Sequence, residues 1–324
     1  MKEFAAVAKA VAEASFIAVS SHENPDGDSL GSHLAMTLVL LSLGKRVFSS
    51  LPDPEKYPPQ YLFLPGREHL AAPAVTHEAP DLFIALDCGN LERLGGLRSL
   101  AETARMLVNI DHHEDNRMFA PLNIVDPEAS STSEIVFKLA RDAGWDIGPD
   151  AATCLYTGVI TDTGRFQHQN TKAETFMIAY RLALEGADVI RVGREVYESQ
   201  SLSYTHLLGI ALRRVEVVED CGLVYSYITR EDLAETGAAL SETEDLIDHL
   251  RAVRGTRVAA VFKELDDGRV RVSLRSRDDF QVGPVARALG GGGHATAAGY
   301  TSRKDLAGSL DELLEALRDA HGWS

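Results

Sequence analysis

The stretch Met106-Leu107-Val108-Asn109-Ile110-Asp111-His112-His113 gives the first indication of fold and chemistry in this chain of 324 residues. Its first five residues are mostly apolar and typical of a buried strand. One acid and two histidines stand where that strand would end. Carboxylates and imidazoles are common metal ligands. A three-residue match arises easily by chance, however, and His112 and His113 alone are also consistent with a polar surface pair.

Three further groups of acidic residues stand at the ends of apolar segments. They are His22, Asp26 and Asp28 after 16–20, Asp87 after 82–86, and Asp162 after 151–160. Each has a simpler interpretation: Asn-Pro-Asp-Gly at 24–27 is a good turn, an acid after a strand often caps a helix, and Asp162 stands close to a glycine. All four groups together favour a site for two divalent cations that acts on phosphate esters.

The composition is that of a globular protein, with 45% hydrophobic and 25% charged residues. No apolar run approaches the ~20 residues of a membrane span, and the N-terminus lacks the features of a signal peptide. The three cysteines are far apart and form no Cys-x-x-Cys pair. We therefore expect a cytoplasmic protein without a membrane segment.

The net charge of −16 argues against binding to long duplex nucleic acid, which depends on many lysine and arginine contacts. A short anionic substrate stays compatible with this charge, because bound cations can dominate the local field. Residues 251–287 are locally basic, with nine Lys/Arg against five Asp/Glu. A solvated face is the ordinary interpretation of such a stretch.

Residues 1–165 alternate apolar strands with helical stretches, which predicts an α/β fold with a parallel sheet covered by helices on both faces. The predicted strands are 16–20, 46–49, 82–87, 106–111 and 122–125, and helices are predicted at 32–43 and 151–160. Ser131 and Glu134 have the spacing of a capping box at the start of another helix. Because ligands of such sheets bind beyond the carboxyl ends of the strands, the acidic residues should meet there.

The pattern changes in the second part of the chain. We expect a catalytic domain at 1–188, a linking helix at 189–212, and a smaller mixed α/β domain at 213–324. In the smaller domain, strands are predicted at 214–218, 223–228, 257–263 and 270–275, and helices at 282–289 and 304–320. Asp267-Gly268 predicts a hairpin turn between the last two strands.

Motifs along nearly the whole chain resemble those of one superfamily. Four segments resemble, in order, the four motifs of the DHH phosphoesterase superfamily: 22–32 (HENPDGDSLGS), 87–89 (DCG), 111–113 (DHH) and 162–164 (DTG). The tract 290–299 (GGGGHATAAG) resembles the signature of the substrate-binding domain in the nucleic-acid-directed branch. The resemblance is strongest to the short group of nanoRNases and pAp phosphatases.

The resemblance implies a role for each residue of the site. One manganese ion would be held by His22, Asp26 and Asp87, and the other by Asp28, Asp87, His112 and Asp162. Asp111 would orient the histidines from behind, and His113 would face the scissile phosphate. Hydroxide activated by the two cations would attack phosphorus in line, without a covalent intermediate.

The second part of the chain carries the candidate substrate-binding residues, which are Arg275, Arg277, Gly292, Gly293 and His294. On a strand, Arg275 and Arg277 would face the same side, ready for bidentate contacts with phosphate. The glycine tract would leave backbone N–H groups open to a phosphate, although such tracts are usually flexible linkers. The resemblance implies that Arg275 and His294 bind the terminal phosphate or the base of the substrate.

We therefore predict a manganese-dependent hydrolase that cleaves very short oligonucleotides such as pApA or pGpG to 5′-mononucleotides. 3′-Phosphoadenosine-5′-phosphate (pAp) is a further candidate substrate. The alternative enzyme is an inorganic pyrophosphatase, but that branch of the superfamily is expected to carry a different second domain. The non-enzyme alternative is a nucleotide-binding regulatory module, which is disfavoured because every ligand residue is present. The sequence leaves the oligomeric state open and is compatible with a homodimer.

Overall fold

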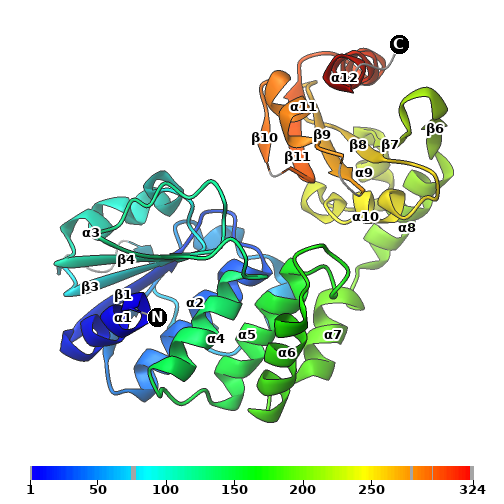
Figure 1. Cartoon of the computed structure of the whole chain (residues 1–324). Coiled ribbons are helices and arrows are strands. Elements are labelled where there is room, and N and C mark those ends of the chain that lie inside the picture. The colour runs from blue at the N-terminus through cyan, green and yellow to red at the C-terminus, as the bar shows by residue number, and fades with distance from the viewer. Residues whose placement is uncertain (1, 74–77, 278–279, 294, 322–324) are drawn as a thin grey trace. The chain divides into compact units, whose positions relative to one another are not determined.

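The computed structural model describes residues 2–73, 78–277, 280–293 and 295–321. The chain divides into two compact units, Met1–Ser199 and Gln200–Ser324, each built around its own sheet (Figure 1). The predicted α/β class, with a parallel sheet followed by a smaller mixed unit, is confirmed. The predicted domain boundaries, and the roles of the units as catalytic and substrate-binding domains, stay predictions.

The sheet of the first unit has five parallel strands in the order β2-β1-β3-β4-β5. The strands are β1 (Phe16–Ser21), β2 (Arg46–Ser49), β3 (Leu82–Leu86), β4 (Met106–Asp111) and β5 (Leu122–Val125). The sequence predicted all five to within about one residue at each end. The strands are nearly continuous apolar runs because a parallel sheet is covered on both faces.

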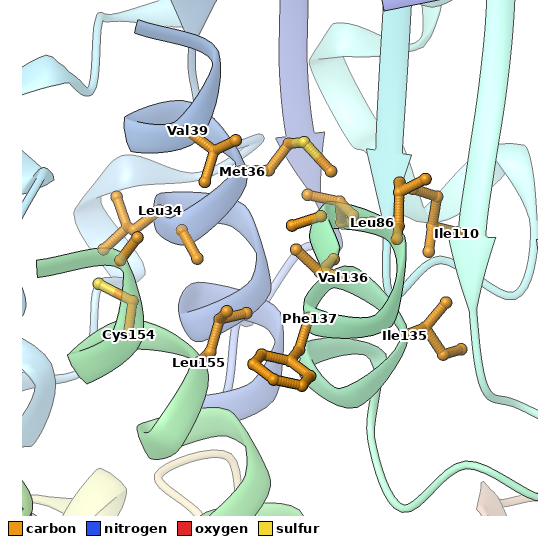
Figure 2. Packing of buried hydrophobic residues seen from close by; sticks show 14 of the residues in the cluster. Leu34, Met36, Val39, Leu86, Ile110, Ile135, Val136, Phe137, Cys154 and Leu155 are labelled. Carbon is orange, nitrogen blue, oxygen red and sulfur yellow. The ribbon is translucent and has the colours of Figure 1, made fainter. Parts of the chain in front are cut away.

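Helices cover both faces of this sheet, as predicted. One face packs against α1 (Lys2–Glu13), α2 (Gly27–Ser42) and α4 (Thr132–Asp142), and the other against η5 (Leu91–Leu97) and α3 (Arg98–Thr103). Alternate residues of β1 point to opposite faces, so that Ile17 and Val19 lie in the first core and Phe16 and Ala18 in the second. Figure 2 shows the first core, in which α2, α4 and α5 (Pro149–Asp162) pack beside the strands.

Three helices of this unit were not predicted, α1, α3 and α6 (Ala173–Leu184). Helix α1 buries Phe4, Val7 and Val11 in the first core of this unit. Helix α6 packs against α5 and keeps Phe176 and Tyr180 more than half exposed. Its mixed surface weakens the one-sided apolar pattern by which an amphipathic helix is recognised.

Helix α2 begins at Gly27, earlier than the predicted start at position 32. The Oδ1 atom of Asp26 accepts hydrogen bonds from the amides of Asp28 at 3.1 Å and Ser29 at 2.9 Å, which caps the helix. The simpler interpretation of 24–27 as a turn is therefore correct, and the turn also caps α2. The second oxygen of Asp26 lies 3.9 Å from Nε2 of His22 and is available for another role.

Helix α4 has half of the predicted capping box. The Ser131 hydroxyl accepts a hydrogen bond from the amide of Glu134 at 3.0 Å, as predicted. The Glu134 carboxylate, however, accepts from the amide and hydroxyl of Ser130, at 3.2 and 2.6 Å, and not from the amide of Ser131. The acid therefore ties down the residue before the cap.

The predicted single helix over 189–212 is wrong. The structure has two helices there, α7 (Val189–Tyr197) and α8 (Leu202–Arg213). The polar run 198–201 separates them, and the Ser201 hydroxyl caps α8 by accepting a hydrogen bond from the amide of Tyr204 at 2.9 Å. Helical spacing of apolar residues continues on both sides of this break, so periodicity alone did not reveal it.

The second unit has a mixed sheet in the order β10-β11-β9-β8-β7-β6, in which only the pair β7–β8 is parallel among the described strands. The strands are β6 (Glu216–Val218), β7 (Leu223–Ile228), β8 (Val258–Glu264), β9 (Val270–Ser276), β10 (Gly292–Gly293) and β11 (Ala297–Ser302). One face packs on α11 (Gly283–Ala288) and α12 (Leu306–His321), the other on α8 and α10 (Leu246–Arg251).

The details of this sheet differ from the prediction at both edges. Strand β6 is shorter than the predicted 214–218, and β11 was not predicted. The hairpin turn at Asp267-Gly268 is present, with the amide of Leu265 donating to the carbonyl of Arg269 at 2.8 Å and Gly268 at a φ of +80°. A left-handed residue at that place is what the Asp-Gly pair predicts.

The glycine tract is an edge strand, and not the linker or open loop that was considered. Gly292 and Gly293 pair antiparallel with β11 as β10. A Cβ atom on Gly293 would lie 2.5 Å from the carbonyl oxygen of Ala297. Two of the N–H groups predicted to be open to a phosphate are used inside the fold, because Gly290 donates to Arg287 and Gly291 to Ala286. The glycines thus allow close strand pairing.

The helices and the cysteines bear on the expected setting of the chain. No helix among residues 2–73, 78–277, 280–293 and 295–321 combines the length and apolar character needed to cross a bilayer. Cys88, Cys154 and Cys221 are free, which agrees with their wide spacing in the sequence, and all three are buried.

Candidate active site

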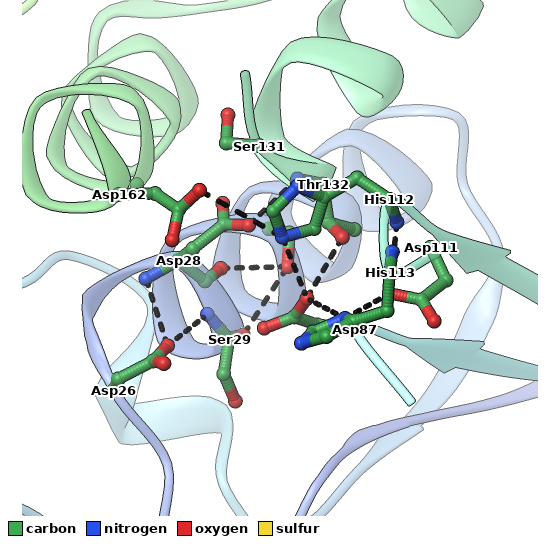
Figure 3. A network of polar contacts seen from close by, with 12 residues as sticks. Asp26, Asp28, Ser29, Asp87, Asp111, His112, His113, Ser131, Thr132 and Asp162 are labelled. Carbon is green, nitrogen blue, oxygen red and sulfur yellow. Dashed lines mark hydrogen bonds and ion pairs between the residues drawn. The ribbon is translucent and has the colours of Figure 1, made fainter. Parts of the chain in front are cut away.

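The predicted site residues of the first unit converge at the carboxyl edge of its sheet (Figure 3). His22 and Asp87 follow β1 and β3, Asp111 ends β4, and His112 and His113 come directly after it. Asp28 lies in the first turn of α2, and Asp162 is the last residue of α5. Parallel strands place their carboxyl ends together, and the two helices bring the remaining acids to the same edge.

Asp87 lies at the centre of this cluster. Its Oδ2 atom is 3.4 Å from Nε2 of His22. Its Oδ1 atom is 3.8 Å from Nε2 of His112 and 3.5 Å from Nδ1 of His113. The two oxygens of one buried carboxylate therefore face imidazoles that come from different strands.

The backbone of Asp87 is strained. Its φ is +58°, a left-handed conformation that is costly for a residue with a side chain. Such conformations concentrate at functional sites, where the surrounding structure holds them in place. Here the amide of Asp87 donates to the carbonyl of Ile110 at 2.9 Å, and the Thr132 hydroxyl donates to Oδ1 of Asp87 at 2.9 Å. The turn directs the carboxylate inward at the end of β3.

Asp28 is bound by the N-terminus of α4. The amide of Thr132 donates to its Oδ2 atom at 2.6 Å and the amide of Ser133 to its Oδ1 atom at 2.9 Å. A helix N-terminus stabilises negative charge through its free N–H groups and its dipole. Each carboxylate oxygen has a second lone pair, so these hydrogen bonds leave Asp28 able to bind a cation.

Asp111 orients the two histidines from behind. Its Oδ1 atom lies 2.7 Å from Nδ1 of His113 and accepts from the amide of His112 at 2.8 Å. Its Oδ2 atom accepts from the side-chain amide of Asn116 at 2.5 Å, and the same amide group donates to Oδ1 of Asn109 at 2.8 Å. Both oxygens of the Asp111 carboxylate therefore accept hydrogen bonds from within the site. This arrangement is the kind of support that fixes the direction of an imidazole.

Asp162 is placed by a residue that follows it in sequence. Its Oδ2 atom is 3.7 Å from Nε2 of His112. The side-chain amide of Asn170 donates to Oδ2 of Asp162 at 3.3 Å, to its carbonyl at 3.2 Å, and to the carbonyl of Ser130 at 2.9 Å. Asn170 thereby joins the end of α5 to the segment that begins α4.

The crowding of acids shifts their ionisation. Burial raises the pKa of Asp28 well above its ordinary value, and the negative charges of Asp87 and Asp162 raise it further. Burial is also the largest cause that raises the pKa of Asp162 to about 7, although the nearby His112 opposes it. Both shifts have the same origin, which is that several carboxylates share a volume with little water.

The imidazoles offset part of this repulsion. Burial would raise the pKa of Asp87, but the hydrogen bond from His22 and the charges of the three histidines outweigh it and lower that pKa. Burial would lower the pKa of His113, but the hydrogen bond with Asp111 and the charge of Asp87 raise it to about 10. In this cluster, carboxylates and imidazoles stabilise each other's charged forms.

The donor set fits divalent cations. Imidazole nitrogens and carboxylate oxygens face each other at 3.4 to 3.9 Å, which is too long for strong hydrogen bonds. Metal–ligand bonds of about 2.0–2.2 Å would span such gaps. Two groups of ligand atoms lie within 4.8 Å of one another, Asp87 with His112 and His113, and His22 with Asp26 and Asp87. Mixed nitrogen and oxygen ligands favour a transition metal over magnesium.

These groups differ in part from the ligand sets that the resemblance implies. His22, Asp26 and Asp87 form one group in both descriptions. The second group contains His113, whereas the implied set contains Asp28 and Asp162 beside Asp87 and His112. The assignment of individual ligands therefore stays a prediction.

The predicted substrate-binding residues lie in the second unit, apart from this cluster in sequence and fold. Arg275 is half-buried on β9, and Arg277 is exposed just beyond its end. The guanidinium of Arg275 donates to the carbonyl of Leu274 at 3.1 Å and that of Arg277 to Val253 at 3.1 Å. Gly292 and Gly293 form β10. His294 lies outside the described residues.

Residues that support the ligands were missed in the sequence. They are Asn109, Asn116, Thr132, Ser133 and Asn170. Among these residues, only Thr132 and Ser133 could have been found from the sequence. Ser131 marks the start of a helix, and helix N-termini attract carboxylates. The asparagines act through contacts that no local pattern shows.

The fold and the site define a class, a parallel-sheet protein with a carboxylate and imidazole cluster suited to metal-assisted phosphate chemistry. Residues 16–159 match the model described as DHH family, N-terminal domain, and residues 221–321 match the DHHA1 domain. The bifunctional oligoribonuclease and PAP phosphatase NrnA of Thermus thermophilus is 32% identical over 321 residues, which cover 98% of this chain and 94% of that protein. The chain therefore belongs to the DHH family, with a DHHA1 domain in its second unit.

Solved structures agree with this assignment. An exopolyphosphatase-related protein from Bacteroides fragilis is similar with a TM-score of 0.93 at 27% identity, over 98% of this chain and 96% of that one. RecJ of Thermus thermophilus in complex with Mn²⁺ has a TM-score of 0.54 at 15% identity, over 98% of this chain and 54% of RecJ. The similarity to RecJ shows a shared fold. The family predicted from the four motifs is confirmed.

Proposed function

We propose that this protein is a manganese-dependent phosphodiesterase that hydrolyses very short oligonucleotides to 5′-mononucleotides and also acts on pAp. The observation that carries the proposal is the position of Asp87, whose two oxygens face His22 on one side and His112 and His113 on the other. One carboxylate between two sets of donors is the arrangement that a pair of cations requires. The names of its relatives support nucleotides as the substrate class.

His22, Asp26 and Asp87 would hold one cation, and Asp28, Asp87, His112 and Asp162 the other. When bound, two such cations lower the pKa of a water and stabilise charge on the phosphoryl oxygens. The chain supplies the geometry: Thr132 and Ser133 fix Asp28, Asn170 fixes Asp162, and Asp111 fixes the histidines. His113 is the residue that would donate to the phosphoryl oxygens of the substrate.

The second unit would select the substrate. Arg275, Arg277 and the β10 edge at Gly292 and Gly293, with His294, would bind the nucleotide's terminal phosphate or base. The DHHA1 match supports nucleotides over pyrophosphate, because the pyrophosphatase branch is expected to carry another second domain. A cytoplasmic location stays a prediction that follows from the sequence alone, and the oligomeric state stays open and compatible with a homodimer.

Metal counting on matched variants tests the shared role of Asp87. Asp126 serves as the control, because it also follows a strand of the sheet but accepts a hydrogen bond from Glu128 at 3.1 Å. Wild type and Asp126→Asn should bind two Mn²⁺ per chain and hydrolyse pApA. Asp87→Asn should bind fewer than two and lose turnover. Two tightly bound ions and a near wild-type rate in Asp87→Asn would overturn the proposal.

A further inference from the structure

The sheet of the second unit carries a row of cationic side chains on one face. In β9, Val270, Val272 and Leu274 point into the core with α11 and α12. The alternate residues, Arg271, Ser273 and Arg275, therefore point to the opposite face. Arg271 is directly paired with Lys263 of β8. Because Phe262 of β8 points into the same core as Val272, the side chain of Lys263 shares the face of Arg271.

Lys263 makes this face unusual, because its side chain is only 1% exposed. A buried ammonium is costly unless it is paired, and its partner is Glu244, with Nζ 3.0 Å from Oε1. Arg271 reaches the same oxygen only at 4.0 Å and keeps its side chain 54% exposed. Lys263 is the closer partner of this carboxylate, so Glu244 compensates the positive charge of Arg271 only in part.

Between the two arginines lies a row almost without side chains. Ser273 of β9 pairs with Gly299 of β11, and Gly299 pairs with Gly292 of β10. On one side of this row Arg271 pairs with the exposed Thr301, and on the other side Arg275 pairs with Ala297. Ser273 itself is buried, so the accessible part of this row is Gly299 and Gly292. Glycines let a ligand backbone approach the sheet closely there, and on β9 an arginine stands on either side of the row.

The spacing of the two arginines indicates what this face binds. Four residues along a strand span about 13 Å, and side chains stand roughly perpendicular to a sheet. Two guanidinium groups held apart in this way suit two separate phosphates better than one.

We infer that the β9 face is a two-phosphate site, in which Arg271 binds a phosphate of the oligonucleotide beyond the one at Arg275. The inference rests on the proposed function for the nucleotide class of the ligand. It adds a residue that favours substrates with several phosphates over mononucleotides. Lys263 acts as a positioning residue, because it makes the closer contact with Glu244 and the guanidinium of Arg271 stays largely exposed.

Binding to the full chain in EDTA tests this site without turnover. The probes are AMP and a 5′-phosphorylated penta-adenylate, measured by titration calorimetry. Arg271→Gln should weaken binding of the pentamer about 10-fold and lower the salt dependence by about one contact, while AMP binding changes less than twofold. Arg269→Gln is the matched control, because Arg269 precedes the same strand and is paired with Asp267 at 2.6 Å; it should change neither.

A variant with the opposite expected sign excludes loss of fold as the cause. Glu244→Gln removes the negative charge beside Arg271 and should tighten pentamer binding about threefold, whereas misfolding only weakens binding. The site is overturned if Arg271→Gln behaves like Arg269→Gln, or if Glu244→Gln weakens pentamer binding while its circular dichroism spectrum and its free energy of unfolding match those of wild type. Turnover is measured in a separate assay. If wild type fails to hydrolyse pApA with Mn²⁺, the proposed function is contradicted. The titrations in EDTA still decide whether the phosphate site exists.

Discussion

Asp28 and Gly158 touch across the contact between α2 and α5, where a Cβ atom on Gly158 would lie 2.5 Å from Oδ1 of Asp28. The same Cβ would lie 2.0 Å from the Ser133 hydroxyl. Further along the contact, a Cβ on Gly31 would lie 2.5 Å from the carbonyl oxygen of Cys154. The position of Asp28 in the site therefore depends on the close contact of α2 with α5, which leaves no room for a side chain at Gly31 or Gly158.

Replacing Gly158 with alanine should damage the site and the fold together. The methyl group must displace Asp28 or Ser133, and overpacking of this kind costs about 1–3 kcal/mol. We expect a lower free energy of unfolding and weaker Mn²⁺ binding, measured by denaturant titration and calorimetry. Gly193→Ala in α7 is the control, because nothing lies within 4 Å of the added Cβ. Equal stability and metal affinity in the two variants would contradict this account.

Asp111→Asn should reduce activity without unfolding the protein. The substitution removes the charge that orients His113 through the 2.7 Å contact with Nδ1. Changes in such supporting groups typically cost about 10–100-fold in metal affinity or activity. We expect a fall of that size in kcat/KM for pApA, with an unchanged circular dichroism spectrum. The exposed neighbour Asp115 provides the control variant Asp115→Asn, and a twofold effect or less in Asp111→Asn would exclude the orienting role.

Asn170→Ala should weaken catalysis through Asp162. The variant loses the side-chain amide that links Asp162 to the carbonyl of Ser130, and we expect kcat/KM to fall about 10-fold. Thr171→Val is a matched control, because the buried Thr171 hydroxyl has no hydrogen-bond partner among the described residues. That variant should keep its activity and stability. Equal rates in both variants would show that Asn170 does not position Asp162.

The acids at the strand ends could be predicted because the signal for each lies in the residues directly before it in the sequence. Asp87 and Asp111 each follow a continuous apolar run, and such runs belong to buried parallel strands whose carboxyl ends meet. The direction of Asp87 could not be predicted, because its left-handed backbone is imposed by neighbours from β4 and α4. Sequence patterns locate residues along elements and do not show such constraints.

Contacts between distant segments were out of reach for the same reason. Thr132 donates to Asp28 across 104 positions of the chain, and no periodicity connects the two. The break between α7 and α8 was missed for a different reason. The apolar spacing continues across it, and the Ser201 cap marks the start of α8. His294, the residue that the resemblance placed at the substrate, lies outside the described residues and stays a prediction.

His33 should make stability depend on pH. It lies fully buried in α2, with Nε2 2.8 Å from the Ser49 hydroxyl and Nδ1 3.3 Å from that of Ser21. Burial lowers its pKa to about 3. Below about pH 6.5 the unfolded chain binds a proton that the folded chain does not. Stability from this group is therefore complete at neutral pH and is lost as the pH falls from about 6.5 toward 3.

The comparison of wild type with His33→Gln isolates this effect. Between pH 7 and pH 5, the free energy of unfolding of wild type should fall by about 2 kcal/mol more than that of the variant. Urea titrations in EDTA at both pH values measure the difference without metal binding. A parallel change in both proteins would mean that His33 is protonated in the folded state.

Product analysis decides whether this chain is a nuclease for very short oligonucleotides. Metal-stripped protein reloaded with Mn²⁺ is incubated in parallel with pApA, pAp, a twenty-mer RNA and pyrophosphate, and the products are separated. We expect rapid, metal-dependent conversion of pApA to AMP, release of phosphate from pAp, and slow cleavage of the twenty-mer. Cleavage of pyrophosphate alone, or no turnover of any substrate, would contradict the assignment of a two-metal nuclease for very short oligonucleotides.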